Sequence, residues 1–504
     1  MPSSPATRNE PPLGAASHGP TPRQLFELGL KFNALNQHQK ALDSFDLAIQ
    51  LQPDFFEAHG NRGAMLAALG RHEDAIESYR KAIAIRPDFA DAHCNLGSAL
   101  TQLQRYVEAL ASLDRAIALR PDYADALYNR GNALKPLQRY EEALASYDRA
   151  IALRPDHTDA HNNRGQVLRE LERYDEALAS YDRALALQPQ HVMAHCNAAA
   201  LRLLTGDFER GWAHYEWRWR KKSVIAANRN FPQPMWRGEP IAGGTILIHS
   251  EQGLGDAIQF CRYVPLVAAR GAQVIFEVQK PLQALMASLG DAAQVVPKGS
   301  PLPTFDLHCP LLSLPGVFGT RIETIPSTAG YLSAPAQHVM AWQSRLEGKR
   351  HPHVGLVWSG NPGHERDRER SIDLRAFLPL LESLAANATF VSLQKDVRPE
   401  DAIVLKERTG ILDLGNTLAD FSDTAALISQ LDLVISVDTS VAHLAGALGK
   451  PVWILLTYFP DWRWLLGRDE SPWYPAARLF RQDKSRTWDG VIARVRQALP
   501  AAIS

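Results

Sequence analysis

The sequence predicts two kinds of structure in one chain, an all-α repeat array in the first half and an α/β region of two lobes in the second. Two observations carry this prediction. Prolines recur every 34 residues through the first half, at Pro53, Pro87, Pro121, Pro155 and Pro189. In the second half, short β-rich runs such as TILIHS and DLVISV alternate with amphipathic segments. Such alternation is typical of a mostly parallel sheet covered by helices.

Composition narrows the classes of function. The 504 residues include 54 Lys and Arg against 55 Asp and Glu, a formal net charge of −1. This balance gives no overall attraction to nucleic acid or to anionic membranes, so neither is expected as a partner. The four cysteines form no CxxC pair and lie in apolar contexts, so we expect buried thiols and neither a disulfide nor a metal site. No cofactor is expected.

The composition of the chain start does not predict a signal peptide. Residues 1–20 are rich in Pro, Ser, Ala and Gly without an apolar stretch, which predicts a disordered leader and not a signal peptide. No apolar run approaches the roughly 18 residues that a membrane span needs. We therefore expect a cytoplasmic protein.

Two further registers share the 34-residue period. Small residues occupy one (Gly29, Gly63, Gly97, Gly131, Gly165), and large apolar residues another (Phe45, Tyr79, Leu113, Tyr147, Tyr181). The pattern resembles the tetratricopeptide repeat, a pair of helices with small residues where they cross and Pro after the second. It implies five clear repeats and a degenerate sixth over residues 21–225. Three tryptophans of the sixth, Trp212, Trp217 and Trp219, are expected to form core where it docks on the next domain.

Asparagines recur in a third register, at Asn61, Asn95, Asn129, Asn163 and Asn197. A helix interior gives Asn no intrinsic advantage, so the recurrence needs a reason. One interpretation is a local hydrogen bond within each repeat. The other is a ladder of amides on the concave face that binds an extended acceptor peptide. The second resembles the asparagine ladder of the protein O-GlcNAc transferases.

Pro and Gly break the pattern over residues 226–243, which we interpret as a linker. We expect a first lobe over residues 244–335, a second over residues 350–485, and a C-terminal helix over residues 486–504. Ligands of open α/β folds bind at the carboxyl ends of the strands, so the cleft between the two sheets is the expected site.

The first lobe begins with HSEQGLGDAIQF, which sets Gly253, Gly255 and Asp256 between a strand and a helix. A dinucleotide-binding fingerprint would require Gly where Ile258 stands, which disfavours a dehydrogenase. Asp256 either caps the helix or faces the cleft, where it would take a proton from an acceptor hydroxyl.

The second lobe offers two candidate donor-binding segments. Arg370 precedes Ser371 at an expected helix start, where a guanidinium and free backbone N–H groups can meet a phosphate. In SVDTSVAHLAGALGKPVW, Asp438 or Thr439 is expected to cap a helix whose N-terminus, with roughly half a positive charge, points at the cleft. His443 lies one turn inside that helix.

The segments GLGD and DTSVAHLAGALGKP resemble those of bacterial GT-B glycosyltransferases, most closely the ADP-heptose:lipopolysaccharide heptosyltransferases. The resemblance covers about residues 244–485 and implies two Rossmann-like α/β lobes. It implies that Asp256 is the general base and that Asp438, Thr439 and His443 hold the sugar nucleotide. Ser440 stands where that family commonly has Gly. In the O-GlcNAc transferases, which also join a repeat superhelix to a GT-B domain, a basic residue placed similarly to Arg370 contacts the donor diphosphate.

The function expected from the resemblance is inverting, metal-independent transfer of a sugar from a nucleotide-sugar donor. The acceptor would be a protein or glycan recruited by the repeats. The alternative is a repeat scaffold for protein interactions whose GT-B domain has lost turnover.

Overall fold

The computed structural model describes residues 19–221, 229–363, 367–384, 387–407 and 410–502. The expected leader therefore lies almost entirely outside the described residues. The chain forms two compact units, the repeat unit (Met1–Ala194) and the α/β unit (His195–Ser504). The division falls at the start of the sixth repeat, so residues 195–221 of the expected repeat region group with the α/β unit. Across the described residues, none of the helices is both long and apolar enough to cross a bilayer.

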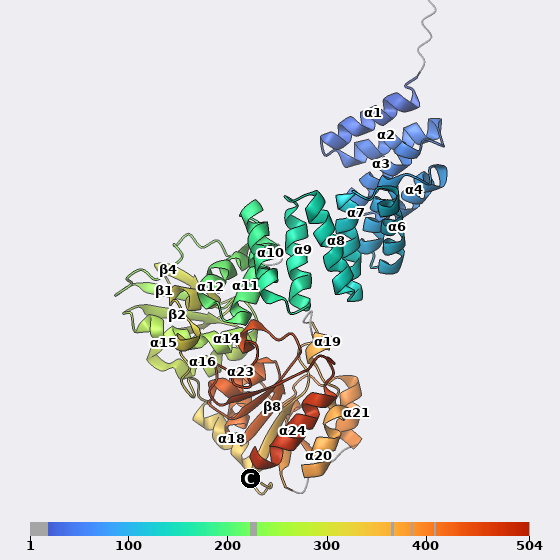
Figure 1. Cartoon of the computed structure of the whole chain (residues 1–504). Helices are drawn as coiled ribbons and strands as arrows, with labels where there is room; N and C mark the ends of the chain where they lie inside the picture. Colours follow the sequence, from blue (N-terminus) through green and yellow to red (C-terminus); the bar gives the residue numbers. More distant parts are fainter. Residues whose placement is uncertain (1–18, 222–228, 364–366, 385–386, 408–409, 503–504) are drawn as a thin grey trace, which may run out of the picture. The chain divides into compact units, whose positions relative to one another are not determined.

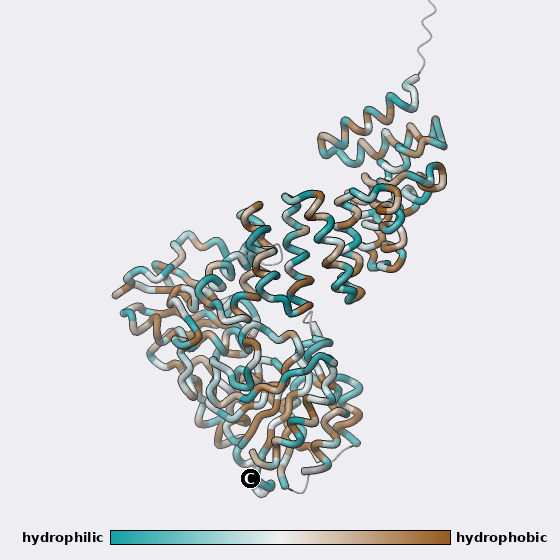
Figure 2. Tube along the Cα trace, viewed as in Figure 1, coloured by the Kyte–Doolittle hydropathy of each residue, from teal (hydrophilic) through white to brown (hydrophobic). Residues whose placement is uncertain are grey.

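The repeat unit consists of antiparallel helix pairs, as the 34-residue period predicts (Figure 1). Its helices are α1 (Pro22–Ala34), α2 (His38–Leu51), α3 (Phe56–Ala68), α4 (His72–Ile85), α5 (Ala90–Gln102), α6 (Tyr106–Leu119), α7 (Ala124–Leu134), α8 (Tyr140–Leu153), α9 (Thr158–Glu170) and α10 (Tyr174–Leu187). Helix α11 (Val192–Thr205) follows. Hydrophilic and hydrophobic residues alternate along these helices, as Figure 2 shows, because each turns one face toward its neighbours.

The glycine and aromatic registers are two sides of one contact. A Cβ on Gly131 would lie 2.5 Å from the Tyr147 ring, and one on Gly165 would lie 2.5 Å from the Tyr181 ring. Both rings are fully buried. The first helix of each repeat can approach the second closely only where it has no side chain, which explains why the two registers recur together.

The first sheet of the α/β unit confirms the predicted βαβ pattern. Its four parallel strands are β1 (Thr245–His249), β2 (Gln273–Val278), β3 (Gln294–Pro297) and β4 (Leu307–Pro310), in the order β3-β2-β1-β4. The helices of this part are α12 (Phe208–Tyr215), α14 (Leu254–Phe260), α15 (Val264–Ala268), α16 (Gln283–Met286) and α17 (Leu314–Val317).

The second sheet is also fully parallel, with the order β10-β9-β8-β5-β6-β7. Its strands are β5 (His353–Val357), β6 (Thr389–Ser392), β7 (Ile411–Asp413), β8 (Leu433–Val437), β9 (Val452–Leu456) and β10 (Ala477–Arg481). The chain reverses its direction of winding between β5 and β8, the switch point at which doubly wound sheets bind ligands. The two outer strands, β7 and β10, were missed by the sequence analysis.

The helices of this part of the chain are α18 (Ala336–Leu346), α19 (Asp367–Arg370), α20 (Leu378–Leu384), α21 (Pro399–Glu407), α22 (Phe421–Ser429), α23 (Ser440–Ala447) and α24 (Asp489–Ala502). The core on one side joins Trp358, Phe390 and Ile435 to Val495 and Leu499 of α24. The predicted C-terminal helix therefore closes the second lobe.

The three tryptophans near α12 do not share one environment. Trp212 is buried as expected, and its Nε1 donates to the Thr320 carbonyl at 2.9 Å. Trp217 and Trp219 are only partly buried and line a cavity of about 470 Å³ beside His249 and His308. The expectation that all three form core is thus wrong for the last two, because they lie past the end of α12.

Candidate functional site

A cavity of about 820 Å³ lies within the α/β unit at the carboxyl ends of both sheets. The loop after β1 lines one side, and the loops after β5, β6, β8 and β9 line the other. Its volume is in the range of pockets for small molecules and cofactors, about 300–1,000 Å³. Eight predicted site residues line it: Gly253, Gly255, Asp256, Arg370, Asp438, Thr439, Ser440 and His443.

Asp256 lies in the first turn of α14, where it both closes the helix start and lines the cavity. Its Oδ2 accepts a hydrogen bond of 2.8 Å from the Gly253 N–H and so closes the helix start. Its Oδ1 pairs with the Arg463 guanidinium. Burial raises the pKa of Asp256 above its ordinary value, although Arg463 acts in the opposite direction. A carboxylate becomes a stronger base as its pKa rises.

Gly255 lies where helix α14 of the first lobe contacts helix α23 of the second. A Cβ at this position would lie 2.9 Å from His443 Cδ2 and 3.4 Å from Ser440 Cα. The N-terminal turns of α14 and α23 can therefore meet only because residue 255 has no side chain. The second glycine of the GLGD segment, Gly255, therefore has a packing role.

Helix α23 begins without a side-chain cap. Thr439 occupies the N-cap position with extended backbone, φ −139° and ψ 171°, but its side chain caps no backbone N–H. Its Oγ1 lies 3.1 Å from Ser436 Oγ instead. The expectation that Asp438 or Thr439 caps the helix is therefore wrong for the Thr439 side chain. An uncapped N-terminus that lines a cavity has N–H groups available for an anion.

Asp438 precedes this helix start. Its Oδ2 accepts a hydrogen bond of 2.9 Å from Trp464 Nε1. Burial, together with the neighbouring Asp461 carboxylate, raises the pKa of Asp438 to about 6. Asp438 therefore gains or loses its charge in the slightly acidic range.

His443 is held by aromatic neighbours. Its Nδ1 lies 2.9 Å from the Tyr474 hydroxyl, and its ring stacks on Trp464 with centroids 5.3 Å apart. Burial, with Arg463 and Arg262 nearby, lowers the pKa of His443 well below its ordinary value. The imidazole is therefore neutral at physiological pH.

Arg370 and Ser371 have different roles. Arg370 lines the cavity, and its Nη1 donates to the Asp438 carbonyl at 3.2 Å. Ser371 is buried; its Oγ accepts from the Gly360 N–H at 3.0 Å and donates to Asp367 at 3.0 Å. Arg370 and Ser371 were expected at a helix start that binds the donor, but α19 ends at Arg370, and the Ser371 contacts hold the segment after β5.

Arg463 is the main residue that the sequence analysis missed. It lies in a short 3-10 turn (Trp462–Trp464) after β9, and its Nε donates to Gln259 Oε1 at 2.7 Å. Its other nitrogens bond Asp256 and Asp461. A signal was present: the charged run DWR closely follows a strand whose carboxyl end faces the cleft, as GLGD and DTS do.

The asparagine register divides between the two units. Within the repeat unit, Asn61 Nδ2 donates to the Glu57 carbonyl at 2.9 Å, a local bond. Asn163 Nδ2 instead bonds Tyr128 and Asn132 of the preceding repeat, at 3.2 and 2.9 Å. Asn129 and Asn163 line a hollow of about 240 Å³ that also contains Asn132 and Lys135. Asn197 belongs to the α/β unit.

Comparisons with known families match both units. Models of the tetratricopeptide repeat match residues 63–104, 97–138 and 128–192. The model of glycosyltransferase family 9 (heptosyltransferase) matches residues 414–478, which include Asp438 and His443 but not the GLGD segment. Protein FlbA of Caulobacter vibrioides is 28% identical over 328 residues, 60% of this chain and 54% of that protein. The chain thus spans about half the length of this relative.

Solved repeat structures are similar over part of the chain. MamA is 26% identical, covers 32% of this chain and 95% of its own, and gives a TM-score of 0.30. TTC0263, a TPR protein of Thermus thermophilus, is 26% identical, covers 36% of this chain and 100% of its own, and gives a TM-score of 0.32. YrrB, described as a TPR protein with an unusual peptide-binding site, is 25% identical, covers 34% of this chain and 88% of its own, and gives a TM-score of 0.30.

Proposed function

We propose that this chain, which carries tetratricopeptide repeats followed by a glycosyltransferase family 9 domain, transfers a sugar from a nucleotide-sugar donor to an acceptor. One observation carries the proposal. A single cavity contains a carboxylate from the first lobe and, from the second, an uncapped helix start with an arginine beside it. These are the groups that an acceptor hydroxyl and a departing diphosphate require.

The donor diphosphate would lie at the start of α23. The backbone N–H groups of its first turn and the Arg370 guanidinium can offset the charge that develops on the leaving group. The Ser440 hydroxyl adds a further donor. Since these protein groups supply the positive charge, the proposed transfer needs no metal ion.

The acceptor hydroxyl would lie on the Asp256 side of the cavity. In the proposed inverting reaction, its oxygen attacks the anomeric carbon, its proton passes to Asp256, and the bond to the diphosphate breaks. The raised pKa of Asp256 supports this role. Because Arg463 pairs with Asp256, we expect the carboxylate to turn from Arg463 toward the bound acceptor.

The repeat unit would recruit the acceptor. The hollow beside Asn129 and Asn163 offers amide groups that can donate to and accept from an extended peptide backbone. Lys135 supplies the same hollow with a cation, and burial lowers its pKa. A protein acceptor, or a carrier of the glycan acceptor, fits these groups.

A scaffold without turnover is the second candidate, favoured by one observation: both Asp256 oxygens are already bonded. Titration with ADP-, UDP-, GDP- and CDP-sugars, followed by product analysis with the donor that binds, separates the two. We expect one nucleotide class to stabilise the chain thermally and its sugar to be transferred. Stabilisation without transfer to any supplied acceptor favours the scaffold, and no stabilisation by any nucleotide sugar contradicts donor binding.

A matched pair of variants localises the donor. Arg370→Gln should weaken donor binding, since it removes a charge that lines the cavity. Arg375→Gln lies nearby in sequence, where Arg375 pairs with Asp373 and is exposed, so it should bind the donor as the wild type does. Equal weakening in both variants would argue against the proposed diphosphate position.

A further inference from the structure

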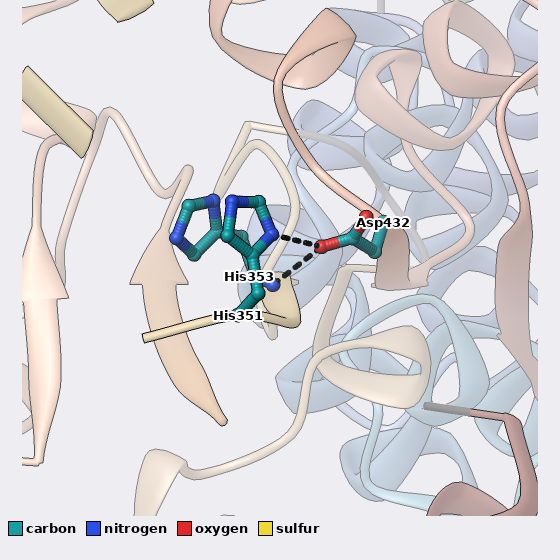
Figure 3. Close-up of side chains that lie close together, drawn as sticks. All are labelled: His351, His353 and Asp432. Atoms are coloured by element: carbon teal, nitrogen blue, oxygen red, sulfur yellow. Dashed lines mark hydrogen bonds and ion pairs between the residues drawn. The ribbon is translucent and has the colours of Figure 1, made fainter. Parts of the chain in front are cut away.

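Three side chains that no part of the proposed function uses meet at the amino end of the second sheet. They are His351, His353 and Asp432, and Figure 3 shows the two imidazole rings side by side with the carboxylate facing them. The ring centroids are 3.9 Å apart and the rings are tilted by 29°. A ligand atom from each of the three residues lies within 4.8 Å of the others.

The backbone explains this meeting. His353 begins β5, and His351 lies two residues before it, in the bend that leads into the strand. Asp432 immediately precedes β8, which pairs with β5 in parallel. The Asp432 N–H donates to the His353 carbonyl at 2.9 Å, and the His353 N–H donates to Asp432 Oδ2 at 2.7 Å. The pairing thus fixes the carboxylate beside the His-X-His segment.

His353 needs a partner that the described residues do not supply. Its side chain is 3% exposed, yet neither Nδ1 nor Nε2 has a hydrogen-bond partner within the described part of the chain. One nitrogen of a neutral imidazole carries a proton and the other a lone pair, and burying both unpaired is unfavourable. His351 differs, since its Nδ1 lies 3.2 Å from Asp432 Oδ2.

We propose that His351, His353 and Asp432 bind a divalent transition-metal ion, Zn²⁺. Two imidazole nitrogens and a carboxylate oxygen are a donor set that Zn²⁺ accepts, with water completing a four-coordinate shell. Binding would turn one unpaired nitrogen of His353 into a ligand. The backbone N–H of His353 would continue to donate to Asp432 and would hold the carboxylate in orientation, as outer hydrogen bonds do for metal ligands.

The site is separate from the cavity. It lies at the amino end of β5, and the cavity lies beyond the carboxyl end of the same five-residue strand, about 13 Å away at the usual rise per residue. The ion would therefore tie the start of β5 to the start of β8 and would take no part in sugar transfer. Its presence or absence is independent of the proposed function.

The test uses the full chain without an affinity tag, freed of metal by a chelator and titrated with Zn²⁺ by calorimetry and thermal shift. We expect one ion per chain with a raised melting temperature. His351→Ala should weaken binding at least about tenfold, in line with the 10- to 100-fold losses that accompany even indirect damage to metal sites. Because His351 is exposed, this variant should fold as the wild type does. His353→Asn should weaken Zn²⁺ binding as well.

His338→Ala is the matched control. His338 also pairs with a carboxylate, Asp423 at 2.8 Å, but no second imidazole stands beside it among the described residues. This variant should bind Zn²⁺ with wild-type affinity and stoichiometry. Absence of stoichiometric Zn²⁺ binding by the wild type, or unchanged binding in both His351→Ala and His353→Asn, would overturn the proposal.

Discussion

The repeat unit and the α/β unit differ in how far apart in the sequence their contacting residues lie. In the repeat unit, Gly131 faces Tyr147 and Arg164 donates to Asp148, each pair only 16 residues apart. In the α/β unit, Arg463 reaches Asp256 across 207 residues and Gln259 across 204. Nearby partners leave a periodic trace in the sequence. Distant partners leave no periodic pattern, so local sequence patterns do not predict the contacts that form the cavity.

The substitution with the greatest predicted effect changes Asp256, the proposed general base of the cavity. Asp256→Asn should lower the rate of sugar transfer on the order of 10²- to 10⁴-fold, because a positioned general base contributes about that much. Asn still offers an oxygen to the Gly253 N–H, so the start of α14 should remain closed. Initial rates and donor titrations check this. An unchanged rate would remove the base assignment, and lost donor binding would mean that the variant damages the cavity itself.

A glycine-to-alanine substitution in each unit compares close helix contacts in the repeats with those at the cavity. Gly131→Ala and Gly255→Ala each insert a methyl group where a Cβ would meet a ring within 2.5 and 2.9 Å, respectively. Overpacking of this kind costs about 1–3 kcal/mol. Gly131→Ala should lower the urea midpoint of the repeats and leave donor binding intact. Gly255→Ala should weaken donor binding, since it displaces His443 or α23. The reverse pattern would contradict the division of roles.

The third prediction concerns pH and Asp438. Its pKa is about 6 in the folded chain and about 3.9 when unfolded, so the folded state binds more protons between those values. Stability from this group therefore falls as pH rises from about 4 to about 6, by on the order of 2 kcal/mol. Urea unfolding of wild type and Asp438→Asn over this range measures the difference. Parallel pH profiles in the two proteins would contradict the raised pKa.

The smallest effect belongs to a repeat ion pair. Arg164 bonds Asp148 at 2.6 Å, with side chains 24% and 48% exposed, respectively. Arg164→Gln should cost on the order of 1 kcal/mol, because it removes a partly exposed ion pair and the hydrogen bond of 2.6 Å from Arg164 Nη1 to Ser180 Oγ. Urea denaturation is the measurement, and Arg149→Gln is a suitable control because Arg149 donates to the Pro121 carbonyl and forms no ion pair among the described residues. A loss of several kcal/mol would mean that these pairs, and not the glycine contacts, hold the repeats together.

Much of the fold was predictable, and the misses have physical reasons. Alternating β-rich and amphipathic segments predicted the inner strands of both sheets, because buried parallel strands are continuous apolar runs. The edge strand β7 spans only three residues, all partly buried, so its hydrophobic signal is weak. Trp217 and Trp219 were expected to form core because the sixth repeat was expected to dock on the next domain, although partial burial is common for large aromatic side chains.

The sequence predicted most residues of the candidate site but not the contacts between them. GLGD and DTSVAH follow strands, and parallel strands end at one edge of a sheet, so their residues were expected near one cleft. That Gly255 allows two helix starts to touch depends on the packing of α14 against α23. The His353 nitrogens became notable only once their burial without partners was known.

The repeat period, the parallel α/β pattern and the segments that end at the cleft follow from the sequence, because each depends on residues close together in the chain. The pairing of Arg463 with Asp256, the start of α23 without a side-chain cap from Thr439, and the meeting of Asp432 with His351 and His353 emerge only in the folded chain. These contacts form between separate strand ends. Their distances are set by sheet order and lobe packing, and no spacing along the chain specifies them.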